Sequence, residues 1–355
     1  MATTLTSTGV SFGQYTSTTR PTGISQGHII YNTDRKGLEI YDGSNWVALE
    51  NDAPFLYRQI IAYGYVYGGY KSSSPWTNVN KMTHSTDGCA DLGNLLQYAG
   101  AYVSGFCNRD NAFLFGCDGT WPGTSTQTSS FNMRNDTTLT ASTNHNMTAS
   151  RNDSGCAFKE HDFGYVCGGG SSQIDVFNGS TETMYAATSG FTTGSYAGDS
   201  TYQYGCSTIS DEHKSLVNLH PQFFKIDHPT STGSSCSTFA GTLSSCGQQK
   251  GINSKVGKGW FGANGTYSGG YILNRWEFAT ETNLGTVNKP MGNCGEENFD
   301  MGQSHQYCMG HYDGAQNNRT WKFYYNTESG TELTASGSIR SGVPGGSSGH
   351  CAWRD

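Results

Sequence analysis

Residues 64–70 read GYVYGGY, a run of aromatic and aliphatic side chains that ends in two adjacent glycines. Such a run is typical of a buried β-strand, and the glycines after it mark a turn. Related runs recur at 112–119 (AFLFGCDG), 164–170 (GYVCGGG), 202–207 (YQYGCS), 258–265 (KGWFGANG) and 306–314 (QYCMGHYDG). The key glycines of the series are Gly68, Gly116, Gly168, Gly205, Gly262 and Gly310. A mean spacing of roughly 48 residues predicts a fold made of repeated units.

Two further signals accompany these glycine strands. A small-residue turn and a cysteine precede the next glycine strand at 104–109 (SGFCNR), 154–159 (SGCAFK), 244–247 (SSCG), 292–297 (GNCGEE) and 349–354 (GHCAWR). The block before Gly205 has 197–204 (AGDSTYQY) in place of the cysteine segment. Aromatic or aliphatic runs follow the glycine strands at 131–133 (FNM), 175–177 (DVF), 223–226 (FFKI), 276–278 (WEF) and 321–323 (WKF). Several strands in each of six periods predict a β-propeller.

The repeat resembles that of kelch-type propellers, in which an apolar strand ends in a Gly-Gly doublet before a long loop and an aromatic strand. Gly68-Gly69 and Gly168-Gly169 keep the doublet, whereas the other blades have Gly-Cys, Gly-Ala or Gly-His. Glycine is expected at these positions because inner strands crowd near the axis and a turn at positive φ excludes a Cβ. Six glycine strands predict six blades.

The C-terminal segment predicts how the ring closes. Residues 349–354 match 154–159, which directly precede a glycine strand, and the series of glycine strands begins near Gly64. We therefore expect the last strand to complete the first blade and to remove the open sheet edges. The predicted fold is all-β, with a small N-terminal β-meander and one kelch-like β-propeller over residues 55–355.

The N-terminal part has a different composition. Residues 1–19 are rich in Thr, Ser and Gly, which predicts an extended arm. Residues 20–54 predict a small β module and a linker, with short strands at 28–31, 38–41 and 46–49. A module of this size has too few large apolar side chains to fold alone, so we expect contacts with copies of itself.

This module resembles one found in structural and fibre proteins of tailed bacteriophages, especially the myovirus-type phages of marine cyanobacteria. The residues that carry the resemblance are 20–23 (RPTG), 27–34 (GHIIYNTD), 38–43 (LEIYDG) and Trp46. The resemblance implies a trimeric or virion-docking element. The alternative is a generic β-hairpin of a larger domain.

Composition excludes several classes of partner. With 21 Lys and Arg against 28 Asp and Glu, the net charge is -7, so a nucleic acid is not an expected partner. No stretch approaches the roughly 18 apolar residues of a membrane span, and the N-terminus lacks the features of a signal peptide. We expect a protein made in the host cytoplasm and located in the virion.

No motif predicts an enzyme, a metal site or a cofactor. The G-x-S-x-G match at 345–349 (GGSSG) has no room for the helix that must follow a nucleophile elbow. His305 and Cys308 should point to opposite faces of one strand, which does not suit metal binding. The 11 cysteines are an odd number without any C-x-x-C pair, so most should be free, buried thiols.

Aromatic side chains in the loops after the glycine strands are the candidate binding residues. They are Tyr70, Trp76, Trp121, Tyr267 and Tyr312, interleaved with Gly, Ser and Asn. Aromatic rings that carry a hydroxyl or N–H group, gathered on one rim of the propeller, suit contact with a host-surface glycan or protein. The alternative is that these rings cover the edges of blades.

Three functions remain open at this point. The favoured one is a fibre or host-attachment protein, a homotrimer that contacts other virion proteins through residues 1–50 and displays the propeller. The second is a decoration, whisker or connector protein whose propeller binds other virion proteins. The third is a propeller glycan hydrolase, which the absence of a recognisable site disfavours. Fold alone does not choose among them.

Overall fold

A computed structural model gives the fold of the 355-residue chain. It describes residues 4–6, 9–16, 18–33, 37–44, 46–48, 61–71, 74–100, 104–108, 110–117, 125–151, 154–159, 163–168, 171–187, 206–210, 214–219, 222–227, 232–236, 252–253, 257–263, 272–288, 298–301, 305–312, 316–333 and 349–354. The protein is all-β and contains many small sheets. The chain divides into two compact units, Met1–Gln59 and Ile60–Asp355.

The first unit contains the predicted meander. Strands β4 (Ile29–Asn32), β5 (Gly37–Tyr41) and β6 (Trp46–Ala48) pair antiparallel in sequence order, which confirms this expectation. Glu39 is buried at the centre of β5, where Arg20 donates two hydrogen bonds of 2.7 Å to its carboxylate. A buried carboxylate needs such a partner to offset its desolvation.

The described segments within residues 1–19 are short extended strands that pair with other strands. Strand β1 (Thr4–Thr6) pairs with β2 (Gly9–Ser11), and β3 (Gln14–Tyr15) runs parallel to β4. The amide of Tyr31 donates to the carbonyl of Gly13 at 2.9 Å, so the edge of β4 provides the order that the sequence lacks. Polar composition alone did not reveal this partner.

The second unit contains six four-stranded sheets among its described residues. Sheet 1 contains β7 (Ile61–Tyr67), β10 (Asn78–Thr83), β11 (Gly88–Asn94) and β32 (Gly349–Arg354). Sheet 2 contains β12 (Ser104–Cys107), β13 (Asn111–Phe115), β14 (Thr128–Asn132) and β15 (Thr137–Thr138). Sheet 3 contains β16 (Ser154–Lys159), β17 (Phe163–Gly168), β18 (Ser171–Asn178) and β19 (Thr183–Ala186).

The remaining sheets follow the same order. Sheet 4 contains β20 (Cys206–Ser210), β21 (Lys214–Leu219), β22 (Gln222–Asp227) and β23 (Thr232–Cys236). Sheet 5 contains β24 (Ile252–Asn253), β25 (Lys258–Ala263), β26 (Ile272–Glu277) and β27 (Thr282–Asn288). Sheet 6 contains β28 (Asn298–Met301), β29 (His305–Tyr312), β30 (Gln316–Tyr324) and β31 (Ser329–Glu332). Two small elements lie in loops, the hairpin of β8 (Tyr70–Lys71) and β9 (Ser74–Pro75) and the 3-10 turn η2 (Thr143–His145).

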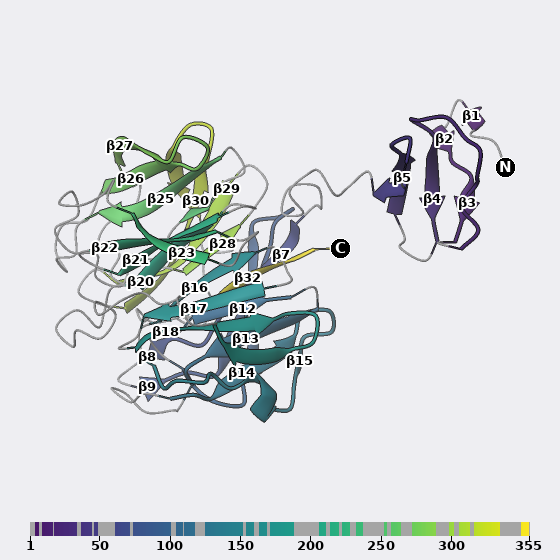
Figure 1. Ribbon diagram of the computed structural model, residues 1–355. Coiled ribbons are helices and arrows are strands. Elements are labelled where there is room, and N and C mark those ends of the chain that lie inside the picture. Colours follow the sequence, from purple (N-terminus) through teal and green to yellow (C-terminus); the bar gives the residue numbers. More distant parts are fainter. Residues whose placement is uncertain are drawn as a thin grey trace. The chain divides into compact units, whose positions relative to one another are not determined.

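Strand β32 joins the two ends of the second unit, as the sequence predicts. It pairs antiparallel with β7 and thereby becomes the first strand of sheet 1, ahead of β7, β10 and β11 (Figure 1). Residue 349 faces Tyr67, and Trp353 faces Tyr63. The edge of β7 is therefore covered by the C-terminal strand rather than by solvent.

Five of the six glycine strands are confirmed as the second strands of their sheets, in β7, β13, β17, β25 and β29. The assignment of 202–207 is wrong. Cys206 begins the edge strand β20 of sheet 4, and the second strand of that sheet is β21, which has no glycine at its end. The aromatic residues before Gly205 resemble a glycine strand, and β21 lacks that signal. The cysteine segments 244–247 and 292–297 lie outside the described residues.

Two glycines show why small residues are needed beside a neighbouring sheet. Gly68 has a φ of +73°, and a Cβ there would lie 2.7 Å from Leu114 Cδ2 of sheet 2. A Cβ on Gly259 would lie 2.4 Å from Ile209 Cδ1 of sheet 4. The expectation of positive φ holds at Gly68 and Gly116, and the crowding comes from the adjacent sheet.

The apolar core lies between successive sheets. Sheets 1 and 2 share a cluster that includes Tyr65, Tyr67, Leu114 and Phe131. Similar clusters join sheets 2 and 3, sheets 3 and 4, and sheets 5 and 6. A further cluster joins sheet 1 to sheet 6 through Val66, Met82, Cys89 and Tyr307. Cys89, Cys117 and Cys167 are buried thiols outside any disulfide bond, and Cys107 is a half-buried one, as the sequence predicts for most cysteines.

Candidate functional site

The predicted binding residues lie partly within the described chain. Tyr70 begins β8, and Trp76 forms an isolated β-bridge with Gly100. Tyr312 ends β29, while Trp121 and Tyr267 lie outside the described residues. The structure thus brings Tyr70 and Trp76 into one loop and does not test a shared rim of all five residues.

This loop is held by the connection that leads to the next sheet. The amide of Gly69 donates to the carbonyl of Gly100 at 2.7 Å, and the amide of Trp76 donates to Gly69 at 2.9 Å. The equivalent loop of sheet 2 is held in the same way, because Ser125 pairs with Arg151. The loops after the second strands therefore have a fixed backbone framework at one end of sheets 1 and 2.

Arg151 extends this framework into sheet 3. Its guanidinium donates to Asp175 at 3.1 Å, and both side chains are fully buried. The connection between sheets 2 and 3 is thus anchored on β18 by a buried ion pair. Breaking such a pair by removing one partner is costly, because the other charge remains buried.

A second repeated feature lies at the opposite end of the sheets, in the turn before each fourth strand. An acidic residue occupies this turn with a φ near 50° in five sheets. These acidic turn residues are Asp87, Asp136, Glu182, Glu281 and Glu328. Positive φ is uncommon for side chains of this kind and costs free energy, so its recurrence indicates a shared role.

Each of four acidic turn residues contacts a basic residue on the third strand of the preceding sheet. Lys81 lies 2.8 Å from Asp136, Lys225 lies 2.9 Å from Glu281, Arg275 lies 3.0 Å from Glu328, and Lys322 lies 2.9 Å from Asp87. The last of these joins sheet 6 to sheet 1. Because these bases and acids lie in successive units, the same ion pair recurs from sheet to sheet.

The sequence spacing of this pair is constant. Lys81 precedes Asp87 by six residues, and the same interval separates Arg275 from Glu281 and Lys322 from Glu328. Each base contacts the acid of the next unit, not the acid six residues later in its own. The sequence alone does not reveal this signal, because Thr-Asp and Thr-Glu before a strand are also typical of ordinary turns.

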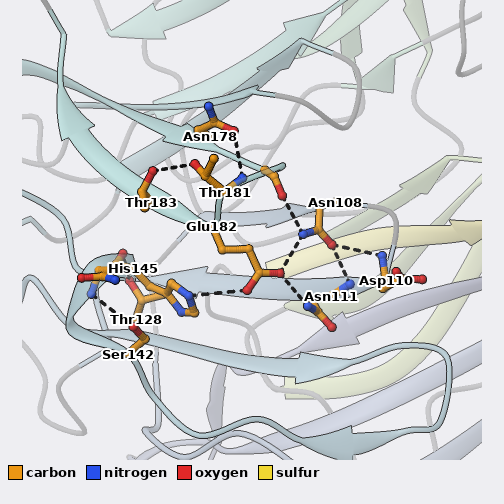
Figure 2. Close-up of polar contacts among 12 residues, drawn as sticks. Asn108, Asp110, Asn111, Thr128, Ser142, His145, Asn178, Thr181, Glu182 and Thr183 are labelled. Carbon is orange, nitrogen blue, oxygen red and sulfur yellow. Dashed lines mark hydrogen bonds and ion pairs between the residues drawn. The ribbon is translucent and has the colours of Figure 1, made fainter.

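Glu182 makes a different contact, between sheets 2 and 3 (Figure 2). The side-chain amides of Asn108 and Asn111 donate to its carboxylate at 2.9 and 2.6 Å. His145 Nε2 lies 3.6 Å away. Burial lowers the pKa of His145, and the charge of Glu182 opposes this effect. Two amide donors here replace the base, since the third-strand position of sheet 2 is Ser130.

The contact between sheets 3 and 4 lacks both members of the pair. The third-strand position of sheet 3 is Val176, and position 231 is a serine, which lies outside the described residues. Val176 packs instead in an apolar cluster with Val217, Phe224 and Ile226 of sheet 4. The base and the acid are therefore replaced together by apolar packing.

Sheets 1 and 6 meet at the richest of these clusters. Tyr307 donates its hydroxyl to Asp87, and Lys322 donates to both oxygens of the same carboxylate at 2.9 and 3.1 Å. Burial alone would raise the pKa of Asp87, but these two donors lower it below its usual value. His84 and His305 lie against the ring of Tyr307.

Within the described part of the chain, no three His, Cys, Asp or Glu side chains come together in a way that could hold a metal ion. Among the same residues, no helix has the length and apolar character to cross a membrane. Comparison with models of known families and with curated proteins finds no match for this chain.

Proposed function

We propose that the chain is a structural protein of a tailed-phage virion, a fibre or host-attachment component. In this proposal the first unit docks or trimerises, and the second displays a closed, six-bladed, kelch-like β-propeller. The observation that carries it is the division of the chain into a small β unit and a large repetitive one. The phage-module resemblance lies entirely in the small unit.

Contacts between first strands support a closed ring. Strand β32 contacts β12, and the chain of contacts continues through β16, β20, β24 and β28 back to β32. In a propeller, the strands nearest the axis meet their neighbours in this way. The glycine strands β7, β13, β17, β25 and β29 would then be second from the axis, and the first strands would be innermost.

The acidic turn residues support equivalent blades. The Lys322–Asp87 pair between the last and first sheets repeats the Lys81–Asp136 pair between the first and second. In a closed ring, the contact between the last sheet and the first should have the same form as the contacts between consecutive sheets. This relationship favours a propeller over an open stack of sheets.

The small unit has a surface suited to assembly. Ile29 faces Ile40 and Tyr31 faces Leu38 across β4 and β5, and all four side chains are half-buried in a single chain. The opposite face is covered by the Arg20–Glu39 pair. Three copies that pack these apolar residues around an axis would supply the burial that this small unit lacks.

The rim aromatics complete the proposal as the surface that would contact a host glycan or protein. Tyr70 and Trp76 lie in one loop whose backbone is fixed by Gly100. Rings on a fixed framework lose little conformational entropy on binding.

Labelling of purified virions with an antibody against the large unit tests this function. Signal at fibre tips and binding of the isolated protein to host cells are expected. Signal at the neck or capsid without binding to cells would instead favour the connector or decoration role. Absence of the protein from virions would refute both.

Truncation tests the division of roles. We expect the full chain to form trimers and a chain that begins at residue 55 to stay folded as a monomer, measured by light scattering and circular dichroism. A monomeric full chain that also fails to bind other virion proteins would contradict the assembly role of residues 1–50.

A further inference from the structure

Two histidines meet where sheet 6 contacts sheet 1. His84 lies in the turn after β10, and His305 begins β29. Their ring centroids are 5.8 Å apart, and both rings stand edge-on to Tyr307, at 4.8 and 5.1 Å. The two imidazoles come from different sheets, so any repulsion between them acts directly on this contact.

A chain of hydrogen bonds fixes which ring nitrogen of His305 carries a hydrogen. Tyr307 donates its single hydroxyl proton to Asp87. The oxygen of Tyr307 lies 3.2 Å from His305 Nε2 and must therefore accept a hydrogen bond from the N–H group at that nitrogen. Lys322 neutralises Asp87 from the other side. Lys322 and Asp87 thus form an ion pair beside the ring of His305.

The groups around the histidines do not favour further positive charge. Lys322 faces them from β30 and lies 5.7 Å from the ring centroids of Tyr307 and Tyr324, while His305 also packs on Tyr324. Among the residues that the structure describes, Asp87 supplies the carboxylate of this cluster. Burial, followed by Lys322 and His84, lowers the pKa of His305 to about 4, although Asp87 opposes the shift.

We propose that the contact between sheets 1 and 6 is an acid-sensitive opening point of the large unit. Protonation of His305 would place a second positive charge beside Lys322 at this contact, against the single carboxylate of Asp87. The sheets then separate at this contact before the other sheet contacts open. This inference depends on the observed contact between the two sheets and not on the proposed phage function.

The direction of the pH dependence follows from the coupling between proton binding by His305 and opening of the contact. A histidine with a lowered pKa in the folded state takes up its proton more readily once the contact has opened and water reaches the ring. Stability of the contact is therefore full above a pH of about 6.5 and is lost as the pH falls from there toward 4. For one such group, the population of the open form rises by up to roughly tenfold per pH unit in this range.

The other sheet contacts provide an internal comparison. Lys81–Asp136 and Arg275–Glu328 each join a lysine or an arginine to a carboxylate. His145 lies beside Glu182, but its ring contacts are with Phe113 and Phe177 rather than with a second histidine. The double-histidine pattern is thus specific to the first–last contact among the described residues.

Hydrogen exchange of the full chain at pH 7.5 and at about pH 5, corrected for intrinsic exchange rates, tests the proposal. Protection of amides in β7, β29 and β30 should fall by roughly tenfold or more at the lower pH, whereas protection in β13 and β14 should change little. Equal loss in all sheets, or no loss in sheets 1 and 6, would overturn it.

Variants and a direct titration complete the test. The double variant His84→Gln/His305→Gln should lose the acid-induced exchange in sheets 1 and 6, and the control His145→Gln should keep it. If the double variant still loses amide protection in sheets 1 and 6 at low pH, the proposal is wrong. If the variant fails to fold, titration of the His305 ring by NMR in the wild-type chain decides, because a midpoint near 6.5 contradicts a buried, charge-excluding site.

Discussion

Lys322 and Asp87 are joined by hydrogen bonds of 2.9 and 3.1 Å although 235 positions separate them in the sequence. The pair connects the last sheet of the large unit to the first. It has the same form as the Lys81–Asp136 pair between sheets 1 and 2. The two pairs therefore allow a local contact and a long-range contact of one geometry to be compared within a single molecule.

A double-mutant cycle with Lys322→Met and Asp87→Asn should give a coupling free energy of about 0.5–1 kcal/mol in low salt. The carboxylate is partly exposed, so solvent screening keeps the value small, and 1 M salt should reduce it further. Urea unfolding measures it. The matched cycle at Lys81 and Asp136 is the control. A coupling free energy of zero in both cycles would show that these ion pairs do not stabilise the contacts between sheets.

The backbone of the acidic turns predicts an unusual ranking of substitutions at Glu281. Glu281→Ala loses both lysine contacts and keeps an unfavourable positive φ, whereas Glu281→Gly loses the contacts but relieves the backbone. We expect the glycine variant to be more stable than the alanine variant by about 1 kcal/mol. The same order should hold at Glu328, and alanine equal to glycine at both sites would contradict the left-handed turn.

Glu281 should also contribute to acid sensitivity. Hydrogen bonds from Lys214 and then Lys225 lower the pKa of its carboxyl. A lowered carboxyl pKa stabilises the folded state above the unfolded value of 4.5, and this contribution disappears as the pH falls through the folded value. Stability measured from pH 6 to 3 should therefore fall less steeply in Glu281→Gln than in the wild type. An identical slope would mean that the two lysines do not hold the charged form.

Gly259 tests the packing of sheet 5 against sheet 4. Gly259→Ala should destabilise the protein by about 1–3 kcal/mol, because the new methyl group would overlap Ile209. The double variant Gly259→Ala/Ile209→Ala should be less destabilised than the sum of the two single variants. Strictly additive losses in thermal or urea unfolding would show that the two residues do not meet.

The sequence predicts the part of the fold that depends on repeated local signals. Aromatic strands with a terminal glycine identify β7, β13, β17, β25 and β29, and the match between 349–354 and 154–159 identifies the strand that completes sheet 1. Sheet 4 was misassigned because β21 has no glycine, and because Tyr202 and Tyr204 mimic the signal one strand too early.

The contacts between sheets are harder to predict from the sequence. Asp136 is six residues after Ser130 but binds Lys81 of the preceding unit, so local spacing does not reveal its partner. His84 and His305 belong to the first and last units and meet only in the folded chain. The rim aromatics remain a prediction, since binding by Tyr70 or Trp76 depends on a partner and not on the fold.

The pairing of β32 with β7 also governs how the protein is made. The ribosome produces β7 near the beginning of the large unit and β32 at its end, so the edge of β7 has no partner while all the intervening sheets emerge. An unpaired edge of this kind is prone to join the wrong strand, and a contact between distant segments forms slowly. Sheet 1 can therefore finish folding only after synthesis of residue 354. Premature termination upstream of β32 would release a chain in which the edge of β7 is unpaired and can pair with a strand of another chain.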